Sequence, residues 1–268
     1  MEKLTFLGVA GNDAVPLGLA SGGMVLNYRN YQILIDPGPG TLLKAREFNI
    51  PIANTNIILA SHNHLAHCSD INLLIDALTY HGMDPRGILI TDESVTHGTN
   101  LERPMLTRLH KRFIEKEAVL LPGQEIVLPS IKIQALKTNH PSCPTAIGFK
   151  IITDELIITY SSDTKFFDDI SDLYRNTDIL ILNVPYPKKV STETNLNIDD
   201  AAKIIYGVKP RLAILTHFNR QLIKESPIYY AREIQRETNI QTIAAKEGLA
   251  IEIMAFSKLF RQNTLTRY

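Results

Sequence analysis

The chain has 268 residues, and 28 basic side chains balance 28 acidic ones, so no global attraction to nucleic acid or an anionic membrane is expected. An apolar fraction of 44% with 21% charged residues excludes a wholly disordered, collagen-like or coiled-coil chain. The two cysteines, Cys68 and Cys143, are too few for a disulfide framework, and we interpret both as small buried side chains.

Short apolar runs bounded by turn residues predict strands along the whole chain. In chain order these cover residues 4–9, 24–28, 32–35, 56–60, 88–91, 125–128, 131–137, 146–152, 156–160, 178–183, 212–216, 242–245 and 249–253. Helical periodicity predicts helices after Gly40 and over residues 71–80, about 105–116, 166–175, 198–206 and 227–237.

The order of these elements predicts the fold. The first third runs strand, strand, strand, helix, strand, helix. The four strands between residues 125 and 160 then follow one another without a helix, and strand–helix alternation returns after them. This order favours an α/β fold, a four-layer αββα sandwich of two mixed β-sheets with helices on the outer faces. No linker marks a boundary, so we expect one domain over residues 1–268. No apolar run reaches ~20 residues and no signal peptide is recognised, so we expect a cytoplasmic protein without membrane partners.

The stretch "SHNHLAH" follows the apolar run "NIILA" and contains His62, His64 and His67. Alternation in an extended turn lets His62 and His64 face one ion, and His67 is expected at the start of a helix that begins near Cys68. Other strand ends deliver His140, Asp163 and His217. A single histidine is more often a core or capping residue, but five at successive strand ends favour a metal site.

The order H-x-H-x-x-H, lone histidine, aspartate and late histidine, with "ILIDPGPG" upstream and "TIAAKEGLAIEI" near the end, resembles the metallo-β-lactamase superfamily. Within it, the chain looks most like the single-domain hydrolases of the ribonuclease Z and phosphodiesterase kind. The resemblance implies an αββα sandwich with one or two divalent ions at one edge. Zinc is the expected ion, and manganese and iron are the alternatives.

The resemblance also implies a role for each of these side chains. It assigns the first ion to His62, His64 and His140, the second to His67 and His217, a bridging and catalytic position to Asp163, a catalytic position to His217, and an orienting position beneath the site to Asp36.

Ala66 departs from this pattern, because it stands where the family has an aspartate. Asp70 lies four residues on, but we expect it to cap the following helix instead of replacing that ligand. We therefore predict a well-occupied first ion and a weakened second one. Whether the alanine is natural or introduced, it predicts a slow or inactive hydrolase.

The spacing of the motif limits the substrate. Only 22 residues, mostly a predicted strand pair, separate His140 from Asp163, where ribonuclease Z carries its tRNA-gripping arm. We therefore expect a small-molecule substrate, preferably a phosphodiester that pairs with Arg220, and no nucleic-acid partner. A lactone or thioester hydrolase and a non-catalytic metal-binding or sensing protein are the alternatives.

Two expectations concern the assembly of the protein. Many relatives pair, so the resemblance allows a homodimer. The segment from Asp92 to Leu121 has no counterpart in a minimal sandwich. We expect it to cover the mouth of the active site or to form a subunit contact.

Overall fold

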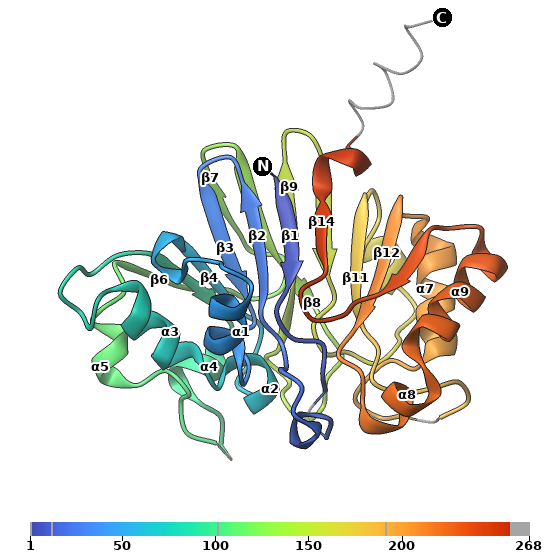
Figure 1. Cartoon of the computed structure of the whole chain (residues 1–268), viewed down its shortest axis with the longest axis horizontal. Coiled ribbons are helices and arrows are strands. Elements are labelled where there is room, and N and C mark those ends of the chain that lie inside the picture. Colours follow the sequence, from blue (N-terminus) through green and yellow to red (C-terminus); the bar gives the residue numbers. More distant parts are fainter. Residues whose placement is uncertain (1, 12, 101, 191, 258–268) are drawn as a thin grey trace, which may run out of the picture.

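The computed structural model describes residues 2–11, 13–100, 102–190 and 192–257. Two seven-stranded sheets built from these residues lie face to face, and helices cover both outer sides (Figure 1). This arrangement confirms the predicted four-layer α/β sandwich. Among the described residues no helix is long and apolar enough to cross a membrane.

The first sheet comes mainly from the first half of the chain. Its strands in spatial order are β14 (Ala250–Glu252), β1 (Lys3–Phe6), β2 (Met24–Tyr28), β3 (Tyr31–Ile35), β4 (Ile57–Ala60), β5 (Ile88–Thr91) and β6 (Lys116–Val119). Pairing is antiparallel from β14 to β3 and parallel from β3 to β6.

The second sheet comes from residues 125–244 and divides in the same way. Its strands in spatial order are β13 (Thr242–Ala244), β12 (Leu212–Thr216), β11 (Ile179–Asn183), β10 (Ile157–Tyr160), β9 (Ile147–Thr153), β8 (Ile131–Lys137) and β7 (Glu125–Leu128). Pairing is antiparallel from β7 to β10 and parallel from β10 to β13. Both sheets are therefore mixed, as predicted.

The helices fall into two sets along the chain. Those of the first half are α1 (Thr41–Glu47), α2 (Leu65–Cys68), α3 (Ile71–Leu78), α4 (Glu93–His97) and α5 (Arg108–Lys111). Those of the second half are α6 (Ile170–Leu173), α7 (Ile198–Val208), α8 (Arg220–Glu225) and α9 (Pro227–Thr238). Short 3-10 helices cover Val15–Leu17, Ile52–Asn54 and Ile253–Phe256.

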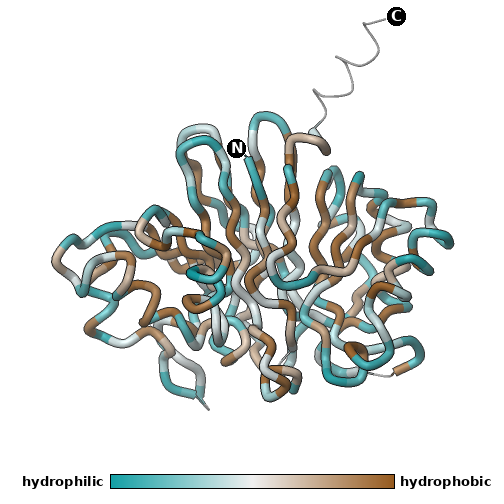
Figure 2. The backbone as a smooth tube through the Cα atoms, in the orientation of Figure 1, coloured by the Kyte–Doolittle hydropathy of each residue, from teal (hydrophilic) through white to brown (hydrophobic). Residues whose placement is uncertain are grey.

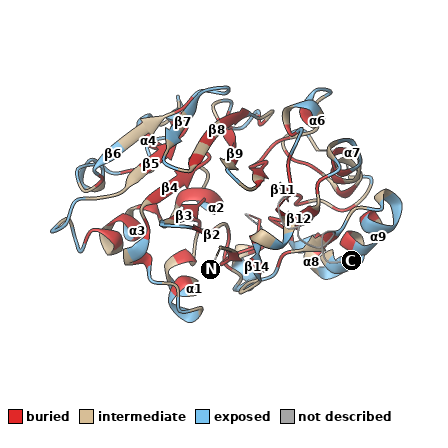
Figure 3. Cartoon of the chain, turned by 90° about the horizontal axis from the view of Figure 1, so that it is seen from above, coloured by how far each residue is buried: buried red, intermediate tan, exposed pale blue. Residues whose placement is uncertain are grey.

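Side chains that alternate along a strand pack into two different apolar cores, one on each face of the sheet. On β3, Ile33 and Ile35 join the core between the sheets, whereas Leu34 joins the core beneath α1 and α3. Each such fully buried side chain contributes about 1.5–3 kcal/mol to folding. Apolar and buried residues are accordingly concentrated in the strands (Figures 2 and 3). The cores on the two faces hold each strand in place. They therefore also position the residues that follow the end of the strand.

Two predicted helices are shorter than expected. The periodicity at 105–116 yields only α5 followed by the edge strand β6, and that at 166–175 yields only α6. Lys116–Val119 is a strand because its backbone pairs in parallel with β5, a tertiary contact that outweighs local helical periodicity.

Candidate metal centre

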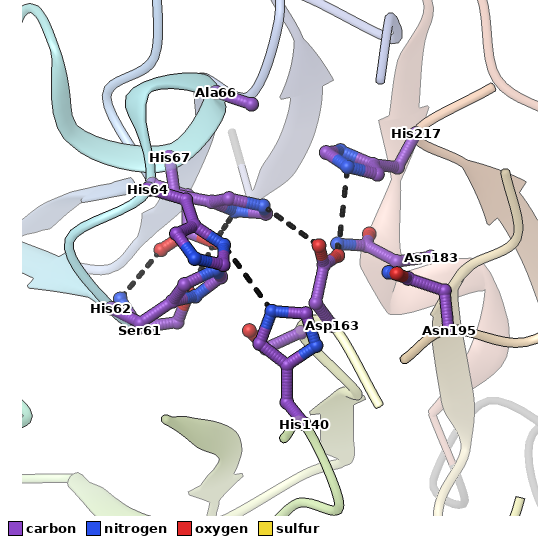
Figure 4. A network of polar contacts seen from close by, with 12 residues as sticks. Ser61, His62, His64, Ala66, His67, His140, Asp163, Asn183, Asn195 and His217 are labelled. Atoms are coloured by element: carbon purple, nitrogen blue, oxygen red, sulfur yellow. Dashed lines mark hydrogen bonds and ion pairs between the residues drawn. The ribbon is translucent and has the colours of Figure 1, made fainter. Parts of the chain in front are cut away.

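Five imidazoles and one carboxylate converge at one edge of the sandwich (Figure 4). They follow the carboxyl ends of β4, β8, β10 and β12, which meet at this edge. One group with ligand atoms within 4.8 Å of one another contains His62, His64, His140 and Asp163. A second group contains His67, His217 and the same Asp163.

In the first group the imidazole nitrogens point at one another. His64 Nδ1 lies 2.9 Å from His62 Nε2 and 3.2 Å from His140 Nε2. His140 Nδ1 lies 2.8 Å from the carbonyl oxygen of Thr194 and donates to it, which leaves Nε2 facing the cluster. Three imidazole nitrogens and a carboxylate form a donor set that suits a tetrahedral divalent ion.

The second group contains a buried nitrogen with no hydrogen-bond partner. Nε2 of His67 is buried and makes no hydrogen bond within the part of the chain that the structure describes, and it lies 3.4 Å from Asp163 Oδ2. Nε2 of His217 lies 3.5 Å from Asp163 Oδ1. An orphaned imidazole nitrogen beside a shared carboxylate is costly without a ligand, so this group also fits a divalent ion.

Asp36 lies beneath the cluster and accepts hydrogen bonds from three neighbours. His67 Nδ1 donates to Asp36 Oδ2 over 2.8 Å, and the Tyr160 hydroxyl donates to the same oxygen over 2.6 Å. The backbone N–H of Ser61 donates to Asp36 Oδ1 over 2.7 Å. Asp36 therefore fixes which nitrogen of His67 faces the cluster, the usual role of a carboxylate behind a ligating histidine.

Sequence reasoning missed Tyr160 and Asn183. The Asn183 amide nitrogen donates to Asp163 Oδ1 over 2.8 Å and to the Tyr160 hydroxyl over 3.1 Å. The two residues thus connect Asp163 with Asp36 through buried hydrogen bonds. Both stand at the carboxyl ends of strands, in "LIITY" and "ILILN", so the rule that found the histidines could have found them too.

Sharp backbone turns bring the strand ends inward. Asp36, Ser162 and His217 are non-glycine residues in the left-handed region, with φ of 47°, 54° and 63°. Such residues cost of order 1 kcal/mol each and are typical of functional sites. Gly38 is required here, since a Cβ on it would lie 1.9 Å from the Ala66 carbonyl oxygen.

Charges differ within the cluster. Burial lowers the pKa of His64 and of His217 to about 4, and both are neutral at pH 7. Burial also lowers the pKa of His67, but the carboxylates of Asp163 and Asp36 outweigh it and raise that pKa to about 10. Burial raises the pKa of Asp163, but His217 and His67 hold it well below its ordinary value. Without a metal, the ionised Asp163 carboxylate therefore lies beside the charged imidazole of His67.

Ala66 contributes only its methyl group. It is buried in α2, one residue before His67, and it lies at the edge of the cluster (Figure 4). His67 thus belongs to α2 and does not stand before a helix beginning near Cys68.

Asp70 was expected to cap the helix that follows it, α3, and this prediction was wrong. The Asp70 side chain makes no capping hydrogen bond to its own helix, α3. Its Oδ2 instead accepts from the backbone N–H of Leu42 over 3.4 Å, at the first turn of α1. Asp70 therefore stabilises a neighbouring helix and does not fill the place of a missing ligand.

A cavity of about 860 Å³ adjoins the cluster at His64 and Ala66. Glu102 and Arg103 line it, so part of the 92–121 segment borders the site. Arg220, expected to contact phosphate, is exposed at the start of α8 and is not among the residues that line this cavity. Arg103 lines the cavity instead.

Comparison with known proteins agrees with this geometry. Residues 31–218 match the family model described as the beta-lactamase superfamily domain, a span that runs from before Asp36 to just after His217. The uncharacterized protein MJ1374 of Methanocaldococcus jannaschii is 29% identical over 256 residues, which cover 94% of this chain and 95% of that protein.

Three solved structures share the fold. The metallo-beta-lactamase fold protein YhfI of Bacillus subtilis has a TM-score of 0.77 at 19% identity, covering 93% of this chain and 98% of that one. The short form of human tRNase Z has a TM-score of 0.69 at 15% identity, covering 94% and 99%. A diphosphatase of the PhnP family has a TM-score of 0.63 at 19% identity, covering 93% and 96%.

Proposed function

The chain belongs to the metallo-β-lactamase superfamily, and on that premise we propose that it is a metal-dependent hydrolase of a small phosphodiester. One observation carries the proposal: imidazoles from both sheets converge in two groups around Asp163. A structural site needs one closed set of ligands, whereas two adjoining sets that share a carboxylate suit a catalytic pair of ions.

We assign the ligands by these two groups. His62, His64 and His140 would hold the first ion with Asp163, and His67 and His217 would hold the second with the same carboxylate. Ions bound there would activate water and stabilise negative charge on the substrate, and zinc is the expected metal.

The surrounding residues prepare these ligands. Asp36 and Tyr160 hold the ring of His67 in one orientation, and Asn183 holds the Asp163 carboxylate. Because Nδ1 of His140 and of His67 face hydrogen-bond acceptors, both rings present Nε2 to the cluster. The centre is therefore pre-organised, which spares the reorganisation that would otherwise weaken metal binding.

A small substrate is favoured by the connection between His140 and Asp163. Strands β9 and β10 occupy half of its 22 residues, so it provides no long arm for a polynucleotide. One of the similar structures is named as a diphosphatase, which supports phosphorus chemistry as the reaction class. Arg103 supplies a cation for the phosphate at the cavity wall.

The second candidate is a non-catalytic metal-binding protein, and Ala66 is the observation that favours it. A methyl group neither coordinates an ion nor accepts a proton, so the second group has only three ligands. A lactone hydrolase would share the same centre, so the assay must include both kinds of substrate.

The test compares the chain with its Ala66→Asp and Ala66→Asn variants. Metal per chain is measured by mass spectrometry, and hydrolysis is followed on bis(p-nitrophenyl) phosphate and on a lactone. We expect Ala66→Asp to gain a second ion and to raise phosphodiester turnover about 100-fold, as expected for a restored acid-base group. Ala66→Asn introduces a neutral side chain of the same size as aspartate, and it should neither gain the second ion nor raise turnover.

If the unmodified chain and both variants bind metal but none of the three hydrolyses either substrate, the hydrolase proposal is wrong and the non-catalytic function is supported. Faster hydrolysis of the lactone than of the phosphodiester would reassign the substrate class. The expected homodimer and cytoplasmic location stay predictions, which light scattering and cell fractionation can check.

A further inference from the structure

The cavity beside the metal cluster has mainly apolar walls. The apolar residues that line it come from the loop after β1, from the turn before α1, from α2 and from the segment after α4: Val15, Pro16, Pro39, Leu65 and Met105. Leu65 is 64% exposed, although it precedes the buried Ala66 and His67. Leu65 and the other apolar lining residues together form a concave apolar surface, which is typical of a binding site.

The polar side chains deep in this wall already have partners. The Ser69 hydroxyl donates to Asp70 Oδ1 over 3.5 Å, and Asn63 Oδ1 accepts from the Cys143 thiol over 3.8 Å. Glu102 and Arg103 are the charged residues of the wall, and both are exposed. Apart from Glu102 and Arg103, the wall therefore offers mainly apolar contact to a ligand.

The cavity is continuous with the proposed reaction centre. His64 and Ala66 belong to both, because His64 is a ligand-capable member of the first group and Ala66 lies beside His67. Its volume of about 860 Å³ is large enough for a ring or a branched alkyl chain. A group bound there would be attached directly to an anion held at the cluster.

From this arrangement we infer that the substrate is a phosphodiester with a bulky apolar ester group, aryl or branched alkyl, which occupies this cavity. The inference rests on the proposed function, since the cluster holds the phosphate. Leu65, Val15 and Met105 are the side chains that select the apolar group, and Arg103 pairs with the phosphate at the exposed rim.

The test measures binding, not turnover. The zinc-loaded full chain is titrated calorimetrically with phenylphosphonate and with methylphosphonate, which carry the same anion and differ in the apolar group. Burial of the ring predicts about tenfold tighter binding of phenylphosphonate. Leu65→Ser and Val15→Ser should each reduce this preference to about twofold or less, because they replace apolar wall with a hydroxyl.

Leu43→Ser is the matched control. Leu43 is 73% exposed on α1 and is not among the residues that line the cavity, so its replacement should leave the tenfold preference unchanged. Leu65 is exposed enough that its replacement should not unfold the chain, which the melting temperature of each variant verifies.

The outcomes separate the two proposals. Equal binding of both phosphonates by the unmodified chain, or a preference that survives both cavity substitutions, would overturn the apolar subsite and leave the hydrolase proposal intact. Failure of both phosphonates to bind the zinc-loaded chain would overturn the anion site itself, and the subsite with it. A preference lost only in the two cavity variants supports the inference.

Discussion

The two ligand groups at the sandwich edge differ in what the chain supplies to each. The first has four donors, three of them imidazoles, and the second has three, one of which is the shared Asp163. In the first group burial keeps His62 and His64 neutral, whereas in the second two carboxylates keep His67 protonated. Neutral imidazole binds metal directly, but a charged one must first lose a proton.

This difference predicts an order of occupancy. His62 and His64 of the first group are neutral before any ion arrives, and this group offers four ligands, so it should fill first and hold its ion tightly. The second lacks a fourth protein ligand at Ala66 and must release a proton, so it should fill later and more weakly. The following predictions test that contrast, beginning with the largest effect.

Asp163→Ala should remove the difference in affinity between the two ions, because Asp163 is a ligand in both groups. We expect both ions to be lost and phosphodiester turnover to fall by at least about 1000-fold, since loss of an outer-shell partner alone costs 10- to 100-fold. Metal analysis and the bis(p-nitrophenyl) phosphate assay measure this. Asp178→Ala is the control, since Asp178 is equally buried but precedes β11 at the opposite edge. Retention of tight metal by Asp163→Ala would contradict the assignment.

A matched pair of substitutions should separate the groups. His140→Ala removes a ligand of the first group only and should weaken the tightest ion by about 100-fold. His217→Ala removes a ligand of the second group only, so the tight ion should remain while the weak one disappears. Competition with a chromophoric chelator measures both affinities. Equal losses in the two variants would show that the groups act as one site.

Proton release is the smallest of these effects. At pH 7 the first ion should release close to no proton from His62 and His64, and the second about one, from His67. Calorimetry in buffers of different ionisation enthalpy counts these protons. The apparent affinity for the second ion should therefore rise with pH until pH exceeds about 10, the pKa of His67 in the metal-free protein.

The stability of the metal-free protein should change with pH in the opposite direction to the affinity for the second ion. The folded pKa of His67 lies above its ordinary value of 6.5, so charged His67 stabilises the metal-free fold in full below pH 6.5, and this contribution is lost as pH rises through about 10. Asp36→Asn removes one of the two carboxylates, so it should lower the pKa of His67 and flatten both pH dependences. An unchanged proton count in Asp36→Asn would refute the role given to Asp36.

Much of the fold follows from local pattern. Strands such as Met24–Tyr28, Ile88–Thr91 and Ile131–Lys137 were predicted with their observed bounds, because apolar runs or apolar–polar alternation between turn residues indicate burial of one or both faces of a strand. The edge strand Lys116–Val119 was missed, because its charged and half-exposed side chains give no such signal. Its conformation depends on a neighbouring strand that lies far away in sequence.

The sequence by itself identified the residues that the structure brings together in the two ligand groups. Histidines and an aspartate at strand ends could be read directly, since strands end where apolar runs end, and such residues gather at one edge of a sheet. The resemblance to the family also predicts that Ala66 stands in the place of an aspartate, and this stays a prediction.

Only the tertiary structure decided the surroundings of these residues. It bonded Asp36 to His67, joined Tyr160 and Asn183 to Asp163, directed Asp70 to α1, and brought Arg103 instead of Arg220 to the cavity wall. Hydrogen bonds require atoms within a few ångströms of one another, and the interaction between charges weakens with distance. The partners named above are far apart in the sequence. Their interactions exist only once both sheets have packed.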